Sequence, residues 1–148
     1  MKQENAVTLK FPSKSANEAF ARTVAAVFAA QLDPTMDELG DIKTAVSEAV
    51  TNCIVHAYED TIGTVTLRMR ILPDSVFEIT VKDQGRGIAD VEQARQPMFS
   101  TGGEERSGMG ITIMESFMNE VRITSKEGRG TTVRMRKKIV SRGNALER

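Results

Sequence analysis

The fold is decided by one long amphipathic stretch, residues 35–58, which reads TMDELGDIKTAVSEAVTNCIVHAY. Its first residues have the spacing of a capping box, in which Thr35 and Glu38 satisfy each other's backbone amides at the start of a helix. Apolar residues then recur at intervals of three or four positions, which places them on one helical face. We therefore predict a long helix from residue 35 to about Tyr58, packed on a core through that face.

A polar stripe runs beside this apolar face. Glu48, Asn52 and His56 are spaced four residues apart, so they return to nearly the same line on a helix. A carboxylate and a carboxamide one turn apart offer hard oxygen ligands, which suit Mg²⁺ with its retained water and phosphate oxygens. Taken alone, such a triplet is more typical of a solvated helix edge. Cys53 lies on the apolar face and is interpreted as small core filler.

Helical and strand patterns alternate outward from this stretch. Residues 15–32 open with capping-box spacing and predict a first helix, and residues 111–118 are apolar enough for a buried helix. Residues 91–95 form a short helix at best, and the glycine-rich residues 97–110 are interpreted as a mobile flap. Five runs have the composition and alternation of strands: 6–11, 64–72, 76–82, 121–125 and 131–137. These elements predict an α+β two-layer sandwich, an antiparallel mixed sheet covered on one face by helices.

Length and composition indicate one soluble domain. The chain has 148 residues, of which 40% are hydrophobic and 27% charged, and we expect a single domain over residues 1–140 with a polar tail over 141–148. Twenty basic residues balance twenty acidic ones, which argues against direct nucleic-acid binding and against a polybasic membrane anchor. A single cysteine, with neither a signal core nor an apolar span, predicts a cytoplasmic protein.

A glycine-rich loop follows the predicted strand 76–82. It reads Asp83-Gln84-Gly85-Arg86-Gly87, a D-x-G-x-G pattern in which glycines permit positive φ and let the backbone lie against a flat ring. The carboxylate of Asp83 would accept a hydrogen bond from the exocyclic amine of adenine, whereas guanine presents a carbonyl oxygen at that position. The same pattern is also common in ordinary turns.

Two further glycine motifs come later in the chain. Gly108-Met109-Gly110 opens the predicted helix, where exposed amides and the helix dipole favour an anion, and Arg106 would add a cation for a terminal phosphate. The stretch 128–131 ends in Gly130-Thr131 at the start of a strand, where a hydroxyl could pair with a base edge. Each motif alone is weak evidence, since a hairpin turn or a helix start explains it equally well.

The four motifs gain specificity from their order, with about 30, 25 and 20 residues between successive ones. Glu48 to Asn52, D-x-G-x-G, G-x-G and G-T follow one another as in the GHKL ATPase superfamily, which the chain resembles over residues 35–137. The resemblance implies the GHKL (Bergerat) fold, an ATP/ADP site and a Mg²⁺ ion. It assigns nucleotide binding to Asn52, Asp83, Gly85, Gly87, Ser107, Gly108, Met109, Gly110 and Thr131.

The resemblance also implies roles in phosphoryl transfer. Asn52 would be the Mg²⁺ ligand, Glu48 would orient or deprotonate an attacking serine hydroxyl, and Arg106 would contact the γ-phosphate. Positioning and charge neutralisation supply most of the catalysis of phosphoryl transfer, so a small set of side chains suffices. His56 is assigned a structural role.

Several phrases narrow the resemblance to the bacterial anti-sigma factor kinases of the sporulation branch. They are EAFAR (18–22), QLDPTMDE (31–38), EAVTN (48–52), ARQP (94–97) and ERSGMG (105–110). This similarity implies a serine protein kinase that binds a sigma factor, phosphorylates an anti-sigma antagonist and forms a homodimer, with Arg22 on the partner-binding surface. The segment around Gly102-Gly103 departs from the lysine- and proline-bearing lid expected in such proteins, which puts any lid lysine contact in doubt.

Three other interpretations compete with this one. A stress-response anti-sigma kinase would have the same architecture, and a nucleotide-gated binding module would share the site without kinase activity. A histidine-kinase catalytic domain would need a phospho-acceptor histidine on a dimerisation helix, and this chain has only His56 within the nucleotide motif.

Overall fold

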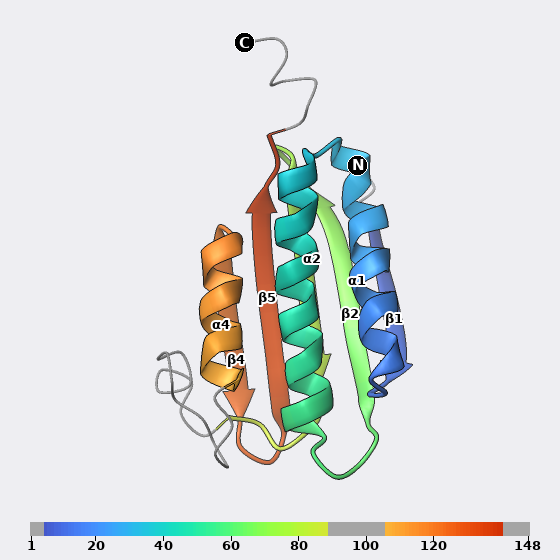
Figure 1. Ribbon diagram of the computed structural model, residues 1–148, viewed down its shortest axis with the longest axis vertical. Helices are drawn as coiled ribbons and strands as arrows, with labels where there is room; N and C mark the ends of the chain where they lie inside the picture. Colours follow the sequence, from blue (N-terminus) through green and yellow to red (C-terminus); the bar gives the residue numbers. More distant parts are fainter. Residues whose placement is uncertain (1–4, 89–105, 141–148) are drawn as a thin grey trace.

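The computed structural model describes residues 5–88 and 106–140, with residues 106–109 described by their backbone alone. The described residues form one antiparallel sheet with helices on one of its faces (Figure 1). In chain order the elements are β1 (Asn5–Pro12), α1 (Ala16–Ala29), the 3₁₀ turn η1 (Ala30–Leu32), α2 (Met36–Thr51), the π-helical turn η2 (Asn52–Ala57), β2 (Thr64–Leu72), β3 (Val76–Asp83), α4 (Arg106–Phe117), β4 (Glu120–Lys126) and β5 (Gly130–Lys138).

The predicted long helix is confirmed as α2 and η2. Its capping box is present: Glu38 N donates to Thr35 Oγ1 at 3.1 Å, and Thr35 N donates to Glu38 Oε1 at 2.9 Å. From Asn52 onward the helix widens to a π-helical turn, and Tyr58 N donates to Cys53 O at 3.1 Å across five residues. Such π-helical turns are rare and concentrate at functional sites, and this one holds the end of the predicted polar stripe.

The sheet has five strands in the order β1-β2-β3-β5-β4, and all four pairings are antiparallel. The predicted hairpin is confirmed between β2 and β3, where Asp74 and Ser75 adopt positive φ in the turn. Pairing Asp83 with Thr131 across β3 and β5 brings two of the predicted nucleotide motifs together. The fold class is therefore the predicted α+β sandwich, with no parallel pairing among the described strands.

The core lies between the sheet and the helices. On the central strands β2, β3 and β5, most residues on one face are buried, and the intervening residues lie on the opposite face. The helices cover one face of this sheet (Figure 1). The largest fully buried side chains include Phe77, Ile42, Leu67, Met69 and Met135. This alternation is the period-two pattern expected of a sheet with only one covered face.

Two local predictions are wrong. The capping box at Ser15 does not form, because Ser15 itself has helical φ and ψ and makes no side-chain cap, while Glu18 instead bonds Arg22. Residues 106–110, predicted as part of a flap, are the first turn of α4. The predicted short helix at 91–95, the rest of the flap with Gly102-Gly103, and the tail 141–148 lie outside the described residues.

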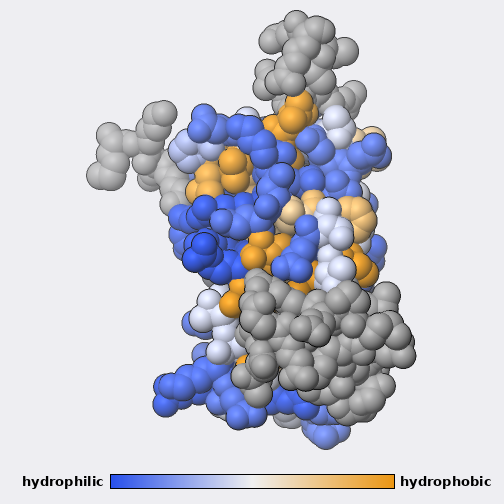
Figure 2. All heavy atoms as spheres, turned by 90° about the vertical axis from the view of Figure 1, so that its left-hand side faces the viewer, coloured by the Kyte–Doolittle hydropathy of each residue, from blue (hydrophilic) through white to orange (hydrophobic). Residues whose placement is uncertain are grey.

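The surface is mostly polar. Seen from the α4 side, hydrophobic residues break through an otherwise hydrophilic surface (Figure 2). Of the helices in residues 5–88 and 106–140, none has the length and apolar character needed to cross a membrane.

Candidate functional site

The end of α2 and the start of α4 meet at one point. A Cβ atom added to Gly110 would lie 3.0 Å from Glu48 Oε2 and 3.6 Å from the Asn52 side-chain oxygen and nitrogen. The absence of a side chain at Gly110 therefore lets α4 approach both polar residues. The structure brings together Glu48, Asn52 and Gly110, which the sequence placed in two separate motifs.

Asn52 carries the clearest sign of a ligand. Its Oδ1 atom is buried and has no hydrogen-bond partner among the described residues. Buried polar atoms in native proteins nearly always have partners, so an orphaned acceptor calls for an explanation such as an ion or water. A carboxamide oxygen beside the Glu48 carboxylate is a donor set that suits a hard divalent cation.

The N-terminus of α4 points to an anion. Because the helix begins at Arg106, the amides of residues 106–108 in its first turn have no acceptor within the helix. These amides and the positive end of the helix dipole favour a phosphate group. Ser107 and Gly108 thus lie in the turn whose amides are available to an anion, and Met109 follows them in the same turn, while the side chain of Arg106 is outside what the structure describes.

Asp83, the last residue of β3, is a buried carboxylate held by three donors. Its Oδ1 atom accepts from Gly85 N at 2.9 Å and from Thr131 N at 3.2 Å. Its Oδ2 atom accepts from Cys53 Sγ at 3.5 Å. Backbone amides from the glycine loop and from the start of β5 therefore fix one oxygen, and among the described residues a weak thiol is the sole donor to the other.

The electrostatic setting of Asp83 is unfavourable to its charge. Burial raises the pKa of Asp83, and the bonds from Gly85, Cys53 and Thr131 lower it only in part. Burial, together with the neighbouring Asp83, likewise raises the pKa of the Cys53 thiol, so Cys53 is a neutral donor. A carboxylate held without a cation beside it has capacity for a further donor, such as the amine of adenine.

The glycine loop after Asp83 is shaped by two close approaches. A Cβ atom on Gly85 would lie 2.3 Å from Ala57 O, so only glycine lets this loop pass the end of η2. Gly87 has φ of +77° and faces Lys126 O across the β4–β5 turn. The predicted D-x-G-x-G loop is thus packed between the α2–η2 helix and the hairpin that carries Thr131.

Thr131 is buried and bonded through its hydroxyl. Its Oγ1 atom lies 2.8 Å from Ser125 Oγ, which also accepts from Ile88 N at 2.7 Å. The predicted base-edge hydroxyl therefore lies beside Asp83 as expected, and it is oriented by a serine on the adjacent strand.

Sequence reasoning missed three residues of this site. Ser125 orients Thr131, Cys53 donates to Asp83, and the hydroxyl of Tyr58 accepts from Gln84 N at 2.7 Å while donating to Thr64 O at 2.8 Å. Cys53 is therefore more than the core filler that its apolar position suggested. Its spacing from Asp83 gives no signal, because the packing of η2 on the end of β3 brings the two residues together.

Arg22 lies apart from these motifs, on α1. Its Nε atom donates to Glu18 Oε2 at 3.0 Å, and its side chain is 40% exposed. The predicted partner-binding residue is therefore on the surface of a different helix from Glu48 and Asn52.

Comparison with known proteins places the chain in a family. The histidine kinase-like ATPase domain matches residues 11–137. The anti-sigma F factor of Caldanaerobacter subterraneus subsp. tengcongensis is 60% identical over 140 residues, covering 94% of this chain and 97% of that protein. The anti-sigma F factor of Geobacillus kaustophilus is 56% identical over 137 residues, covering 91% of this chain and 93% of that protein.

Solved structures agree on the fold. The structure of the RsbU and RsbW domains of Rv1364c from Mycobacterium tuberculosis superposes with a TM-score of 0.67 at 18% identity, covering 91% of this chain and 32% of that one. A histidine kinase domain from Erythrobacter litoralis superposes with a TM-score of 0.57 at 23% identity, covering 82% and 60%. With the matches in sequence, they lead to one conclusion: the chain belongs to the histidine kinase-like ATPase family, in the group of the anti-sigma F factors.

Proposed function

We propose that this protein is an anti-sigma factor that binds a sporulation sigma factor and uses Mg-ATP to phosphorylate a serine on an antagonist protein. The observation that carries the proposal is the convergence of Glu48, the orphaned Asn52 oxygen and the start of α4. The names of the anti-sigma F factors that share more than half of its residues support the choice of partner.

The adenine end of the nucleotide would lie at Asp83. Its Oδ2 atom, to which the Cys53 thiol is the one donor in the described part of the chain, would accept the exocyclic amine, and Thr131 would contact the base edge. Gly85 and Gly87 shape the loop beside the ring. The amides at the start of α4 would bind the phosphates, which places the two ends of ATP on motifs more than 20 residues apart in sequence.

Asn52 would hold Mg²⁺ through its buried Oδ1 atom, and the ion would neutralise charge on the phosphate oxygens. Glu48 lies one turn earlier and would accept the proton of the attacking serine hydroxyl. The serine oxygen would form a bond to the γ-phosphorus while the bond from that phosphorus to the β–γ bridging oxygen breaks, which leaves ADP. Arg106 would stabilise the charge of the transferring group.

Partner binding is assigned to α1. Arg22 is accompanied on this helix by two exposed large hydrophobic residues, Phe20 at 49% and Val27 at 68%. Exposed apolar residues together on one element often mark a protein interface. A homodimer acting in the cytoplasm would complete the proposed mode of action.

The experiment is a phosphotransfer assay with γ-labelled ATP, Mg²⁺ and a candidate antagonist. We expect label on an antagonist serine, loss of transfer in Glu48→Ala with ATP binding retained, and full transfer in Asp37→Ala, an exposed carboxylate on the same helix. ATP binding without transfer to any serine would reject the kinase and leave a nucleotide-gated binding module. Equal transfer in Glu48→Ala would remove Glu48 from its role.

Sigma-factor binding is tested separately by calorimetry. Arg22→Ala should weaken binding of the sigma factor, whereas Lys43→Ala, an exposed basic residue on α2, should leave it unchanged. Equal affinity of the two variants would remove Arg22 from the interface.

A further inference from the structure

The sheet face opposite the helices carries an excess of positive charge. Cross-strand pairing places alternate residues of all five strands on this face. Two of its charged residues are acidic, Glu78 and Glu120, and nine are basic. The basic residues are Lys10, Arg68, Arg70, Lys82, Arg122, Lys126, Arg134, Arg136 and Lys138. Nearly half of the chain's twenty basic residues are therefore on this one face. Because the whole chain has no net charge, the excess here is offset by acidic residues elsewhere.

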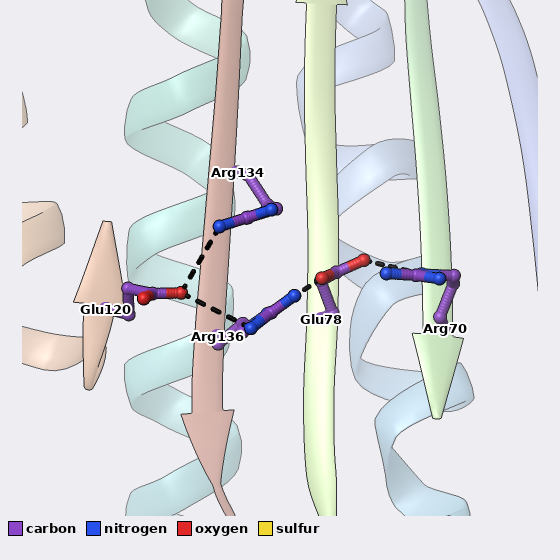
Figure 3. A network of polar contacts seen from close by, with 5 residues as sticks. All are labelled: Arg70, Glu78, Glu120, Arg134 and Arg136. Atoms are coloured by element: carbon purple, nitrogen blue, oxygen red, sulfur yellow. Dashed lines mark hydrogen bonds and ion pairs between the residues drawn. The ribbon is translucent and has the colours of Figure 1, made fainter. Parts of the chain in front are cut away.

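One row of this face neutralises itself. Arg70, Glu78, Arg136 and Glu120 are successive cross-strand partners on β2, β3, β5 and β4 (Figure 3). Arg70 Nε donates to Glu78 Oε1 at 2.6 Å, and Arg136 Nε donates to Glu78 Oε2 at 2.8 Å. Arg136 also lies 3.7 Å from Glu120, so positive and negative charges alternate along the row.

The next row toward the nucleotide end is different. Arg68, Thr80, Arg134 and Arg122 are cross-strand partners, and this row contains no carboxylate. Arg122 lies directly opposite Arg134, a like-charge pair that costs stability in a sheet. Arg134 reaches back to Glu120 at 3.6 Å, which is its ion pair in the neighbouring row.

A third row continues the excess. Lys10, Thr66, Lys82, Thr132 and Thr124 are cross-strand partners, again without a carboxylate. The second and third rows together hold five cations, interspersed with threonine hydroxyls. Among the described residues, Lys10, Lys82 and Arg122 of these rows form no ion pair, and Arg122 faces Arg134 at a cost to the stability of the sheet, so these three cations are available to an external counter-charge.

We propose that these two rows form a docking surface for the acidic face of another protein. Guanidinium groups and threonine hydroxyls side by side present the donors that carboxylates accept. A second copy of this chain is a poor occupant, because a two-fold interface would place the basic rows against themselves. The surface lies on the opposite side of the sheet from α1, so a partner here leaves Arg22 accessible (Figure 1).

Nucleic acid fits the surface less well than an acidic protein. Nucleic-acid-binding domains commonly have an isoelectric point above about 9, whereas this chain has a sequence pI of about 6.6. Its acidic residues elsewhere would repel a long polyanion that extends past the sheet. A partner recognised at short range through a local cluster of carboxylates avoids that repulsion.

The test uses a glutamate-threonine alternating peptide of about ten residues, the length of a long strand. We expect binding that weakens with added salt and falls about tenfold in the double variant Lys82→Ser/Arg122→Ser, since exposed pairs each contribute modestly. Lys14→Ser/Lys43→Ser removes the same charge from exposed positions elsewhere and should bind the peptide normally. ATP affinity should stay unchanged in both double variants, which confirms that they fold.

Three results would overturn the proposal. Absence of peptide binding to the unsubstituted protein is the first, and equal loss in the two double variants is the second. The third is a different occupant: tighter binding of a DNA duplex through Lys82 and Arg122, or self-association in sedimentation that these substitutions abolish.

Discussion

Two buried carboxylates on β3, Glu78 and Asp83, have pKa values shifted in opposite directions. Glu78 and Asp83 are 2% and 6% exposed and lie on opposite faces of the sheet. Burial would raise the pKa of Glu78, but the bonds from Arg70 and Arg136 outweigh it and lower that pKa. Asp83 receives only amides and a thiol, and burial raises its pKa. Glu78 is therefore neutralised by two structural ion pairs, whereas Asp83 retains capacity for a ligand.

The largest effect is expected at Asp83. Asp83→Asn replaces the carboxylate with a group that presents either a donor or a single acceptor, and it should weaken ATP binding about 100-fold, as expected for a hydrogen bond to a charged group. Calorimetric titration with Mg-ATP measures this effect. The matched control is Glu78→Gln, whose ATP affinity should stay within about twofold. An equal loss of ATP affinity in the two variants would show that Asp83 has no ligand-binding role that Glu78 lacks.

At Glu78 we expect substitution to lower the stability of the fold, in contrast to Asp83, where it lowers ATP affinity. Glu78→Gln removes the charge between two guanidinium groups that are 26% and 34% exposed in their side chains. We expect a loss of about 2 kcal/mol, below the 3–5 kcal/mol typical of fully buried pairs because solvent reaches both arginines. Urea unfolding measures this loss. Asp83→Asn should be at least as stable as the unsubstituted protein near neutral pH, and a larger loss there than in Glu78→Gln would contradict the account.

The two carboxylates also predict opposite pH dependences. The lowered pKa of Glu78 means that its stabilisation is present above the ordinary glutamate pKa and is lost as the pH falls through the lowered value. The raised pKa of Asp83 means that its ionisation costs stability, and this cost is relieved as the pH falls from the raised value to the ordinary aspartate pKa. The free energy of unfolding should be measured for Glu78→Gln, Asp83→Asn and the unsubstituted protein as the pH is lowered. The difference between each variant and the unsubstituted protein should shrink, and the two differences should have opposite signs.

The smallest effect is expected at Cys53. Cys53→Ala removes the thiol that donates to Asp83 Oδ2 and should weaken ATP binding about threefold, because a thiol is a weak donor. Cys53→Ser keeps a hydroxyl donor at the same place and should bind ATP nearly normally. Both affinities come from the same titration, and a serine variant as weak as the alanine variant would assign the effect to packing instead.

Local signals in the sequence predicted most of the fold. The capping box at Thr35 formed because its partner Glu38 lies three residues away and is not otherwise bonded within the helix start. The same pattern at Ser15 failed because Ser15 itself has helical φ and ψ and makes no side-chain cap, and the carboxylate of Glu18 bonds Arg22 instead. The predicted strands match the structure within one or two residues at each end, because alternation and the Pro73 turn are both local.

Contacts between elements far apart in the sequence could not be predicted, because strand register and helix packing bring their residues together. Arg70 and Arg136 converge on Glu78 from positions 8 and 58 residues away, and Cys53 reaches Asp83 across 30. No periodicity in the residues predicts the π-helical turn at Asn52, where the helix end packs against the glycine loop. The motif order predicted that Asp83 and Thr131 belong to one site, while the pairing of β3 with β5 explains how they meet.

Recognition of adenine by Asp83 is measured by comparing the binding of ATP with that of inosine triphosphate, in which a carbonyl replaces the exocyclic amine of adenine. If Asp83 accepts that amine, the unsubstituted protein and Glu78→Gln should bind ATP at least about 30-fold more tightly than inosine triphosphate, the effect of losing a charged hydrogen bond. Asp83→Asn should bind the two nucleotides about equally. If Asp83→Asn still bound ATP about 30-fold more tightly than inosine triphosphate, Asp83 would not be the group that accepts the amine.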